Sequence, residues 1–267
     1  MQGDQDDFGH LGFGEAPAHF ESPAQIARVM TEQWALAWLF CPSCGERALR
    51  QFANNSKVAD FHCQECREEY ELKSKKGRFG RKIVDGAYPA MRERLAARNN
   101  PNFLLLTYDA VSRSATDLAV IPKHFFTLDV IEERKPLAAT ARRAGWVGCN
   151  ILLDRIPIAG RIHLLRDRSP VSREQVRAQW DQTLFLRATP LDARGWLLDV
   201  MQVVESIDQV SFSLHDIYSE EDRLQALHPL NRNVRPKIRQ QLQVLRDQGY
   251  LRFLGQGRYE LTNPTEV

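Results

Sequence analysis

Two CxxC units lie near the start of the chain, and they constrain its fold more than any other feature. The first is Cys41-Pro-Ser-Cys44 and the second is Cys63-Gln-Glu-Cys66. Each unit forms a tight turn that aims two sulfur atoms at one point, and residues 45–62 give the spacing typical of a structural zinc site. We therefore expect Zn²⁺ bound by the four cysteines, which leave no open position for a catalytic water. The alternative, four unpaired thiols in a core, does not explain the spacing.

Acidic and basic side chains flank the second CxxC unit. The stretch "KVADFH" before it and "EEYELK" after it mix β-branched or aromatic residues with polar ones, as strands do. In the second stretch, Glu71 and Lys73 share one face of a strand, and Tyr70 and Leu72 share the other. Zinc would clamp the connection between the two strands and hold Asp60 near Glu71 and Lys73.

These residue types suit metal-dependent hydrolysis of a phosphodiester. Asp60 and Glu71 offer hard oxygen ligands for one or two Mg²⁺ ions, and the Leu72 carbonyl would add another. Mg²⁺ offsets negative charge in the transition state and lowers the pKa of a bound water. Lys73 would position or help deprotonate that water and contact the scissile phosphate. The pattern alone is weak, because charged faces of half-buried strands produce it by chance.

The pattern resembles that of the PD-(D/E)XK nuclease superfamily, with Ala59-Asp60 where Pro-Asp is usual. Longer stretches are similar to the DpnI family of methyl-directed restriction endonucleases, roughly from Pro23 to Leu261. These stretches are "CPSCG", "VADFHCQECREEYELKSKKG", "DGAYPAM", "NNPNFLLLTY", "RKPLAATARRAGWVGCNI" and "IRQQLQVLRDQG".

The resemblance implies an endonuclease that cuts G-A-T-C in double-stranded DNA when its adenine carries a 6-methyl group. It places the metal ligands on Asp60 and Glu71 and the catalytic lysine on Lys73. It also implies a fold, a mixed α/β PD-(D/E)XK nuclease core with a four-cysteine zinc site, followed by a C-terminal winged-helix domain. The zinc ligands that it implies are Cys41, Cys44, Cys63 and Cys66.

Composition shifts along the chain predict a mobile acidic tail over residues 1–21, a catalytic domain over 22–182 and a winged-helix domain over 183–267. In the catalytic domain, Ser22-Pro23 is a typical helix start. The stretch "DGAYPAMRERLAARNN" reads as a further helix, and "NFLLLTY", "DLAVIP" and "GRIHLL" read as strands.

The C-terminal part has the element order of a winged helix. Helices are expected over "ARGWLLDVMQVVESI", "LHDIYSEEDRLQAL" and "NVRPKIRQQLQVLRDQGY", with a short "SFS" segment and a final hairpin "LRFLGQGRYELT". In the third helix, an apolar stripe would dock on the domain and a basic face would enter the major groove. The stripe is Val234, Ile238, Leu242 and Leu245, and the basic face carries Arg232, Arg235, Arg239 and Arg246.

We expect Gln243 to read an adenine edge, with Gln240 further round the helix as the weaker candidate. Arg232, Arg235 and Arg239 would contact DNA beside them. The alternative is a solvated amphipathic helix in a protein-binding domain, because fold does not fix function.

The basic stretch "RKPLAATARRAGWVG" predicts a second DNA contact. Trp146 lies between two glycines and would stack on or wedge into a base step, with Arg142 and Arg143 on phosphates or base edges. Burial of Trp146 in packing is the alternative.

Charge and cysteine use bear on partners and compartment. The formal net charge is only +2, but basic residues gather locally, which suits a polyanion such as DNA. No secretory signal or membrane-spanning run is evident, so we expect a cytoplasmic protein without a membrane partner, monomeric in solution. Reduced cysteines then favour metal binding over disulfides. Cys149 has no CxxC partner and is expected to be a small buried hydrophobe.

Two other functions remain open from the sequence. One is a non-catalytic, zinc-containing winged-helix DNA-binding regulator, in which Asp60, Glu71 and Lys73 are only surface charges. The other is a structure-selective nuclease such as a junction resolvase, which would keep the chemistry and change the substrate.

Overall fold

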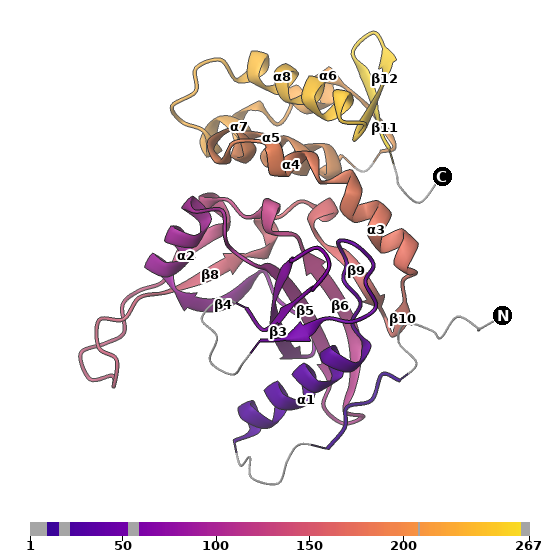
Figure 1. The fold of residues 1–267 in the computed structure, drawn as a ribbon. Coiled ribbons are helices and arrows are strands. Elements are labelled where there is room, and N and C mark those ends of the chain that lie inside the picture. Colours follow the sequence, from indigo (N-terminus) through magenta and orange to yellow (C-terminus); the bar gives the residue numbers. More distant parts are fainter. Residues whose placement is uncertain (1–9, 16–21, 53–58, 208, 263–267) are drawn as a thin grey trace, which may run out of the picture.

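The computed structural model describes residues 10–15, 22–52, 59–207 and 209–262, which form two domains stacked one on the other (Figure 1). Within these residues, the first domain is built on a seven-stranded sheet in the order β1-β2-β3-β5-β6-β9-β10. Its strands are β1 (Arg50–Gln51), β2 (Phe61–His62), β3 (Glu69–Lys76), β5 (Asn102–Asp109), β6 (Ser114–Ile121), β9 (Ile162–Arg166) and β10 (Ser169–Pro170). The pair β3 and β5 is parallel and the other neighbours are antiparallel.

A parallel pair needs a crossover connection. Here the crossover contains β4 (Lys82–Ala87) and α2 (Tyr88–Ala96). Strand β4 belongs to a second sheet in the order β4-β8-β7, with β8 (Gly148–Leu152) and β7 (Ile131–Glu133). The expected helix over "DGAYPAMRERLAARNN" therefore starts later than predicted, because Pro89 fits only the first turn of a helix.

Both faces of the large sheet are covered, which explains the unbroken apolar run of β5. Alternate β5 residues belong to different cores. Leu104 and Leu106 belong to a core shared with α1 (Pro23–Trp38) and α3 (Arg173–Gln182). Phe103 and Leu105 belong to a core shared with α2, the small sheet and the second domain, and short turns complete that side. The turns are η1 (Lys123–Phe125), η2 (Leu128–Val130), η3 (Leu153–Arg155), η4 (Ile158–Gly160) and α4 (Phe185–Ala188).

Residues 10–15 correct part of the prediction of a mobile tail. The Leu11 carbonyl accepts a hydrogen bond from the Ala115 amide at 2.8 Å, and the Phe13 amide donates to the Arg113 carbonyl at 2.7 Å. The Phe13 ring also lies edge-on to Trp34, 6.1 Å between centroids. The apolar residues of this segment thus anchor it to the first domain. The rest of the predicted tail, residues 1–9 and 16–21, lies outside the described residues.

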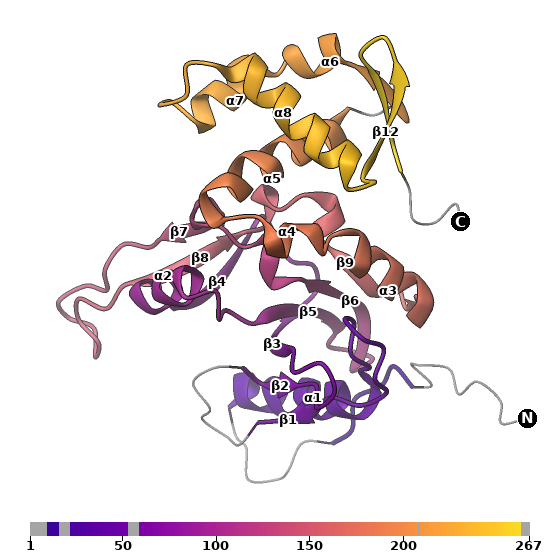
Figure 2. The ribbon, with the colours of Figure 1, turned by 45° about the horizontal axis from the view of Figure 1, so that its top comes forward.

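The second domain is a winged helix, as predicted (Figure 2). Its elements are α5 (Leu191–Ser206), β11 (Ser211–Ser213), α6 (Leu214–Tyr218), α7 (Glu221–Leu227), α8 (Val234–Asp247), β12 (Leu251–Gly255) and β13 (Arg258–Leu261). The strands form a sheet in the order β11-β13-β12. The helix expected over "LHDIYSEEDRLQAL" is two helices, because consecutive acidic residues from Glu220 favour a new helix N-terminus there.

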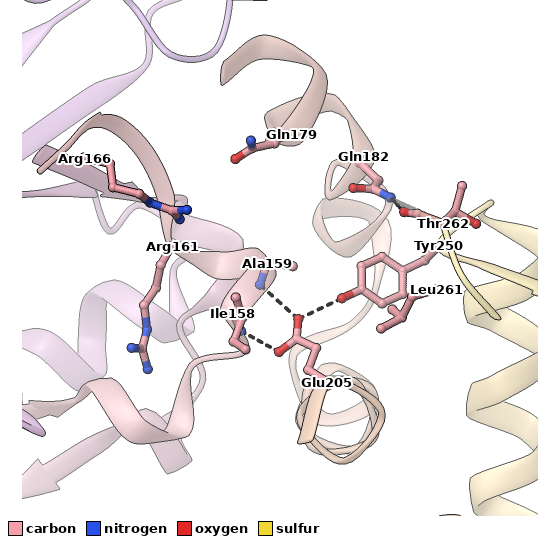
Figure 3. A pocket seen from close by; sticks show the side chains of 10 residues that line it. All are labelled: Ile158, Ala159, Arg161, Arg166, Gln179, Gln182, Glu205, Tyr250, Leu261 and Thr262. Carbon is pink, nitrogen blue, oxygen red and sulfur yellow. Dashed lines mark hydrogen bonds between the residues drawn. The ribbon is translucent and has the colours of Figure 1, made fainter. Parts of the chain in front are cut away.

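Helix α5 lies between α8 and the first domain in both Figure 1 and Figure 2. Glu205 on α5 accepts hydrogen bonds from the amides of Ile158 and Ala159 in the first domain and from the Tyr250 hydroxyl (Figure 3). Thr183, expected to open the second domain, bonds to His124 in the first. We therefore propose that the second domain starts at α5. None of the described helices has the length and hydropathy that crossing a membrane requires.

Candidate active site and metal centre

The four predicted zinc ligands converge. The sulfur atoms of Cys41, Cys44, Cys63 and Cys66 all lie within 4.8 Å of one another, as ligands of a single ion do. The fifth cysteine, Cys149, is fully buried elsewhere in the core, as expected. Sulfur donors in this number suit Zn²⁺.

The two CxxC turns have the same backbone design. In each, the first cysteine accepts a hydrogen bond from the residue four positions on, Gly45 at 2.8 Å and Arg67 at 3.0 Å. Both of those residues have a positive φ, +80° at Gly45 and +61° at Arg67. Glycine adopts this conformation without steric cost and arginine does not. The second turn thus keeps the geometry of the first despite a less suitable residue.

A buried tyrosine supports the cluster. The Tyr70 hydroxyl lies 3.1 Å from the Cys41 sulfur. Burial raises the pKa of Tyr70 well above its ordinary value, so the phenol keeps its proton and can donate it to a thiolate. Burial also raises the pKa of the Cys66 thiol to about 11, so a bound cation is needed to stabilise its thiolate form at neutral pH.

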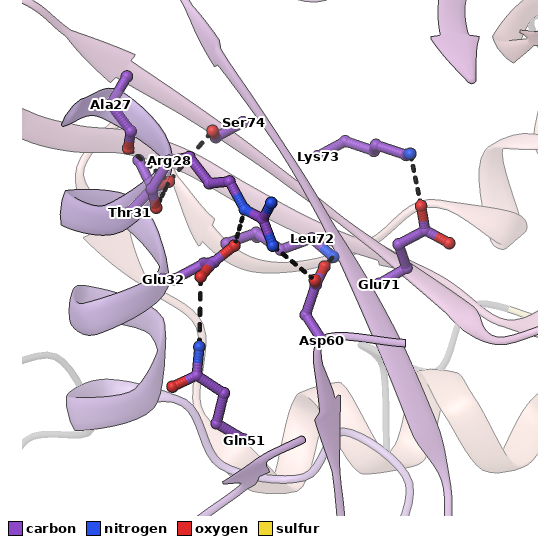
Figure 4. A network of polar contacts seen from close by, with 10 residues as sticks. All are labelled: Ala27, Arg28, Thr31, Glu32, Gln51, Asp60, Glu71, Leu72, Lys73 and Ser74. Atoms are coloured by element: carbon purple, nitrogen blue, oxygen red, sulfur yellow. Dashed lines mark hydrogen bonds and ion pairs between the residues drawn. The ribbon is translucent and has the colours of Figure 1, made fainter. Parts of the chain in front are cut away.

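The second CxxC turn joins β2 to β3 and so positions the acidic residues. In this hairpin Phe61 is opposite Tyr70, which places Asp60 beside Glu71 at the end of β2. The Asp60 Oδ2 atom accepts a hydrogen bond from the Leu72 amide at 2.7 Å (Figure 4). The carboxylate of Asp60, the residue just before β2, thereby accepts a bond from a backbone amide of β3 that β2 does not pair with. Asp60, Glu71, Leu72 and Lys73 are brought together, as the sequence predicts.

Lys73 is held by two carboxylates. Its Nζ atom lies 2.5 Å from Glu71 Oε1 and 2.6 Å from Asp85 Oδ1. It also lies 5.7 Å from the centre of the Phe103 ring. The Lys73 and Glu71 side chains are 20% and 23% exposed, so they are not freely solvated surface charges. Asp85 is on β4 and was not among the predicted site residues.

Burial and charge act in opposite directions on Glu71 and Lys73. Burial raises the pKa of Glu71, and this outweighs the lowering caused by Lys73. Burial lowers the pKa of Lys73, but Glu71 and Asp85 together reverse this and leave the pKa raised. Lys73 is therefore a cation at neutral pH.

A cavity of about 320 Å³ opens beside these side chains. It is lined by Asp60, Glu71, Leu72 and Lys73 from the β2–β3 region together with Arg28, Thr31, Glu32 and Ser74. Arg28 of α1 reaches Asp60, with 3.8 Å between Nη2 and Oδ1, and also bonds to Glu32 (Figure 4). Carboxylate and carbonyl oxygens are the donors that Mg²⁺ prefers, and one or two carboxylates suffice for it.

Sequence reasoning missed Arg28 and Glu32. They are four residues apart on α1 and form an ion pair across one helical turn. That spacing is readable from the sequence, but which side of the helix faces Asp60 is not.

The predicted DNA contacts of the first domain lie on the long loop between β7 and β8, which projects from the molecule in Figure 1. Arg142 and Arg143 are exposed and Trp146 is half-buried. The Arg143 guanidinium lies 4.7 Å from the centre of the Trp146 ring. Trp146 also packs against Gly148, where an added Cβ atom would lie 2.7 Å from the ring. One part of the Trp146 ring thus packs against the protein, and the other part is exposed to solvent.

Helix α8 has the predicted division of faces. Its apolar stripe of Val234, Ile238, Leu242 and Leu245 is buried. The basic and amide side chains Arg232, Arg235, Arg239, Gln240 and Gln243 are exposed. Arg235 bonds to Glu221 at 2.7 Å and lies over the Tyr218 ring, and Gln240 accepts a hydrogen bond from Lys237 at 2.9 Å.

Comparison with models of protein families gives matches to both domains. Residues 14–189 match the model described as the Dam-replacing family, DpnI. Residues 192–261 match the model of the Dam-replacing HTH domain. The first match covers more than half of the chain, and the two meet where α5 begins.

Proposed function

This chain belongs to the Dam-replacing family of DpnI-type restriction nucleases, and from that premise we propose that it is a Mg²⁺-dependent endonuclease for duplex DNA. Its proposed target is G-A-T-C with a methylated adenine. The observation that carries the proposal is the convergence of Asp60, Glu71 and Lys73 on one half-buried cavity. Charged groups are costly to bury, so their collection there suits chemistry better than a solvated surface.

The residues of the cavity would have two different roles in hydrolysis. Asp60, Glu71 and the Leu72 carbonyl would hold Mg²⁺, which when bound supplies a water of lowered pKa and positive charge beside the phosphate. Lys73, as a cation, would donate a hydrogen bond to the attacking water or to a phosphate oxygen and offset its charge. Its raised pKa favours this positioning role over proton abstraction.

Two surfaces of the protein, one on each domain, would contact DNA. Arg142, Arg143 and Trp146 on the projecting β7–β8 loop would form one contact. Arg239 and Gln243 on the exposed face of α8, with Arg232 just before the helix, would face a major groove. Because α5 separates α8 from the first domain, the two surfaces would reach different stretches of duplex.

The catalytic proposal is tested with Lys73→Ala. We expect cleavage to fall by roughly 10²- to 10⁴-fold, the usual contribution of a positioned proton donor or acceptor. DNA affinity, measured with Ca²⁺ in place of Mg²⁺, should be retained. Lys75→Ala is the matched control, because Lys75 lies two residues along the same strand and is exposed.

A DNA-binding regulator without catalysis would behave differently. The wild-type protein would then bind duplex DNA and hydrolyse none of it, so Lys73→Ala would have no rate to change. Equal cleavage by wild type and Lys73→Ala would remove Lys73 from the mechanism.

A further inference from the structure

We propose that Asp85 is a positioning residue for Lys73, supplied by a separate sheet to fix the lysine ammonium where hydrolysis needs it. This inference rests on the proposed nuclease function, which it deepens. Asp85 Oδ1 lies 2.6 Å from Lys73 Nζ, and the Asp85 side chain is only 6% exposed. A buried carboxylate at this distance holds a cation far more firmly than an exposed one does.

Lys73 needs such a partner because its side chain is long and flexible. Glu71 also contacts the ammonium, but Glu71 is the proposed metal ligand, so its oxygens are shared between two tasks. Asp85 reaches Lys73 from β4, and it is not among the residues that line the cavity with Asp60 and Glu71. Asp85 thus holds the ammonium without itself lining the cavity that would take the metal.

Strand β4 contains a β-bulge directly after Asp85. Asp85 pairs with Cys149 on β8, but Ala87 pairs with Gly148, so Gly86 is an extra residue in the ladder. A bulge of this kind redirects the neighbouring side chain, and bulges are frequent beside active sites. The Cys149 sulfur lies 3.5 Å from the Gly86 carbonyl oxygen and packs against the bulge.

The same pairing connects Asp85 to the DNA-contacting loop. Strand β8 begins two residues after Trp146, and the Tyr88 amide, just beyond the bulge, bonds to the Val147 carbonyl at 3.1 Å. The strand that carries Asp85 is therefore fastened directly to the end of that loop.

The test compares Asp85→Asn, Asp85→Glu and Glu133→Gln. Glu133 is the matched control because it pairs with Cys149 from the other side of β8 and is exposed. We expect Asp85→Asn to slow single-turnover cleavage of methylated duplex by about 100-fold, the scale of a small misplacement of a catalytic group. DNA affinity, melting temperature and zinc content should stay at wild-type values. Asp85→Glu should recover much of the rate, because it restores the carboxylate.

A second readout needs neither DNA nor Mg²⁺. Labelling of Lys73 by an amine-reactive reagent, followed by mass spectrometry of the peptide, should be faster in Asp85→Asn than in wild type and Glu133→Gln. If the wild type cuts no DNA, the nuclease function fails, and this labelling still decides whether Asp85 holds Lys73.

Three results would overturn the inference. Labelling and cleavage of Asp85→Asn at wild-type rates would show that Lys73 needs no second partner. Recovery of Asp85→Asn by raised Mg²⁺ would make Asp85 a metal ligand instead. Loss of folding in Asp85→Asn together with a slow, normally labelled Asp85→Glu would indicate a purely structural role.

Discussion

The Tyr70 hydroxyl links the zinc cluster to the strand that carries Glu71 and Lys73. It is fully buried and lies 3.1 Å from the Cys41 sulfur. A hydrogen bond to a metal-bound thiolate fixes the ligand and stabilises its charge. Tyr70 is therefore a core residue, and we propose that it also supports the metal centre.

Tyr70→Phe should weaken zinc binding by roughly 10- to 100-fold, the usual effect of removing such a partner. Competition with a chromogenic chelator measures this directly. Tyr108→Phe is the control, because Tyr108 lies on β5 and does not contact the cysteines. Equal zinc affinity in both variants and the wild type would contradict the role of the hydroxyl.

Much of the candidate site follows from residue identity and spacing. CxxC spacing identifies the four cysteines, and strand periodicity places Glu71 and Lys73 on one face. Asp85 could not be found this way. It is 12 residues beyond Lys73 and reaches it only through a second sheet, and no local pattern reports a contact made by tertiary packing.

We propose that the β2–β3 hairpin depends on a metal ion bound by the four cysteines. Strand β2 is only two residues long. Cys63 follows it directly, and the four cysteines of both CxxC turns meet there. So short a strand gains little from its own hydrogen bonds, and zinc bound by four thiolates would supply the missing folding energy. Loss of zinc should therefore displace Asp60 from Glu71.

Cys63→Ser tests this dependence. We expect loss of zinc, a lower melting temperature and loss of cleavage even with saturating Mg²⁺, because Asp60 is no longer held. Cys149→Ala should keep a full equivalent of zinc, as measured by elemental analysis. Full activity of zinc-free Cys63→Ser would contradict the account.

Helix α8 gives a contrast between two neighbouring side chains. Gln243→Ala should reduce discrimination between adenine and other bases by about 1–3 kcal/mol, because a bidentate amide contact is lost. Arg239→Ala should instead weaken binding to all sequences. It should also reduce the slope of log binding constant against log salt concentration by about one unit. Binding titrations at several salt concentrations distinguish the two effects. An identical loss for all sequences in both variants would remove Gln243 as a reader.

At the level of elements, long periodic segments were predictable and short ones were not. The apolar stripe of α8 and the buried run of β5 were read correctly, since many residues repeat the same signal. The residues Asp85 to Ala87 were assigned to a helix, although they end strand β4. Burial alternates along that strand, but Val84 is exposed and the Asp85 side chain is buried, so the sequence lacks the usual alternation of apolar and polar residues.

Glu205, a half-buried residue of α5, joins the two domains in addition to their apolar packing. Glu205 accepts hydrogen bonds from Ile158, Ala159 and Tyr250. Glu205→Ala should lower the free energy of unfolding by about 1–3 kcal/mol, because buried donors lose their acceptor. Tyr250→Phe removes a single donor and should cost about 0.5–1.5 kcal/mol. Chemical denaturation measures both, and equal stability of Glu205→Ala and wild type would contradict this.

Glu205 also predicts a pH dependence of stability. Burial raises its pKa, although its hydrogen bonds act in the opposite direction. The folded protein then binds this proton more tightly than the unfolded chain does. The resulting stability is present below the ordinary value of 4.5 and is lost as pH rises through the folded pKa. The melting temperature of the wild type relative to Glu205→Gln should therefore fall over that interval. A constant difference would contradict the shift.

At the scale of the whole molecule, we propose two DNA-contacting surfaces, the β7–β8 loop and the exposed face of α8, and one cavity that cuts methylated DNA. The most direct measurement incubates the purified zinc-loaded protein and Mg²⁺ with two duplexes that differ only in adenine methylation at G-A-T-C. The account predicts cleavage of the methylated duplex alone. Equal cleavage of both duplexes would contradict the proposed trigger, and binding of both without cleavage would contradict the proposed reaction.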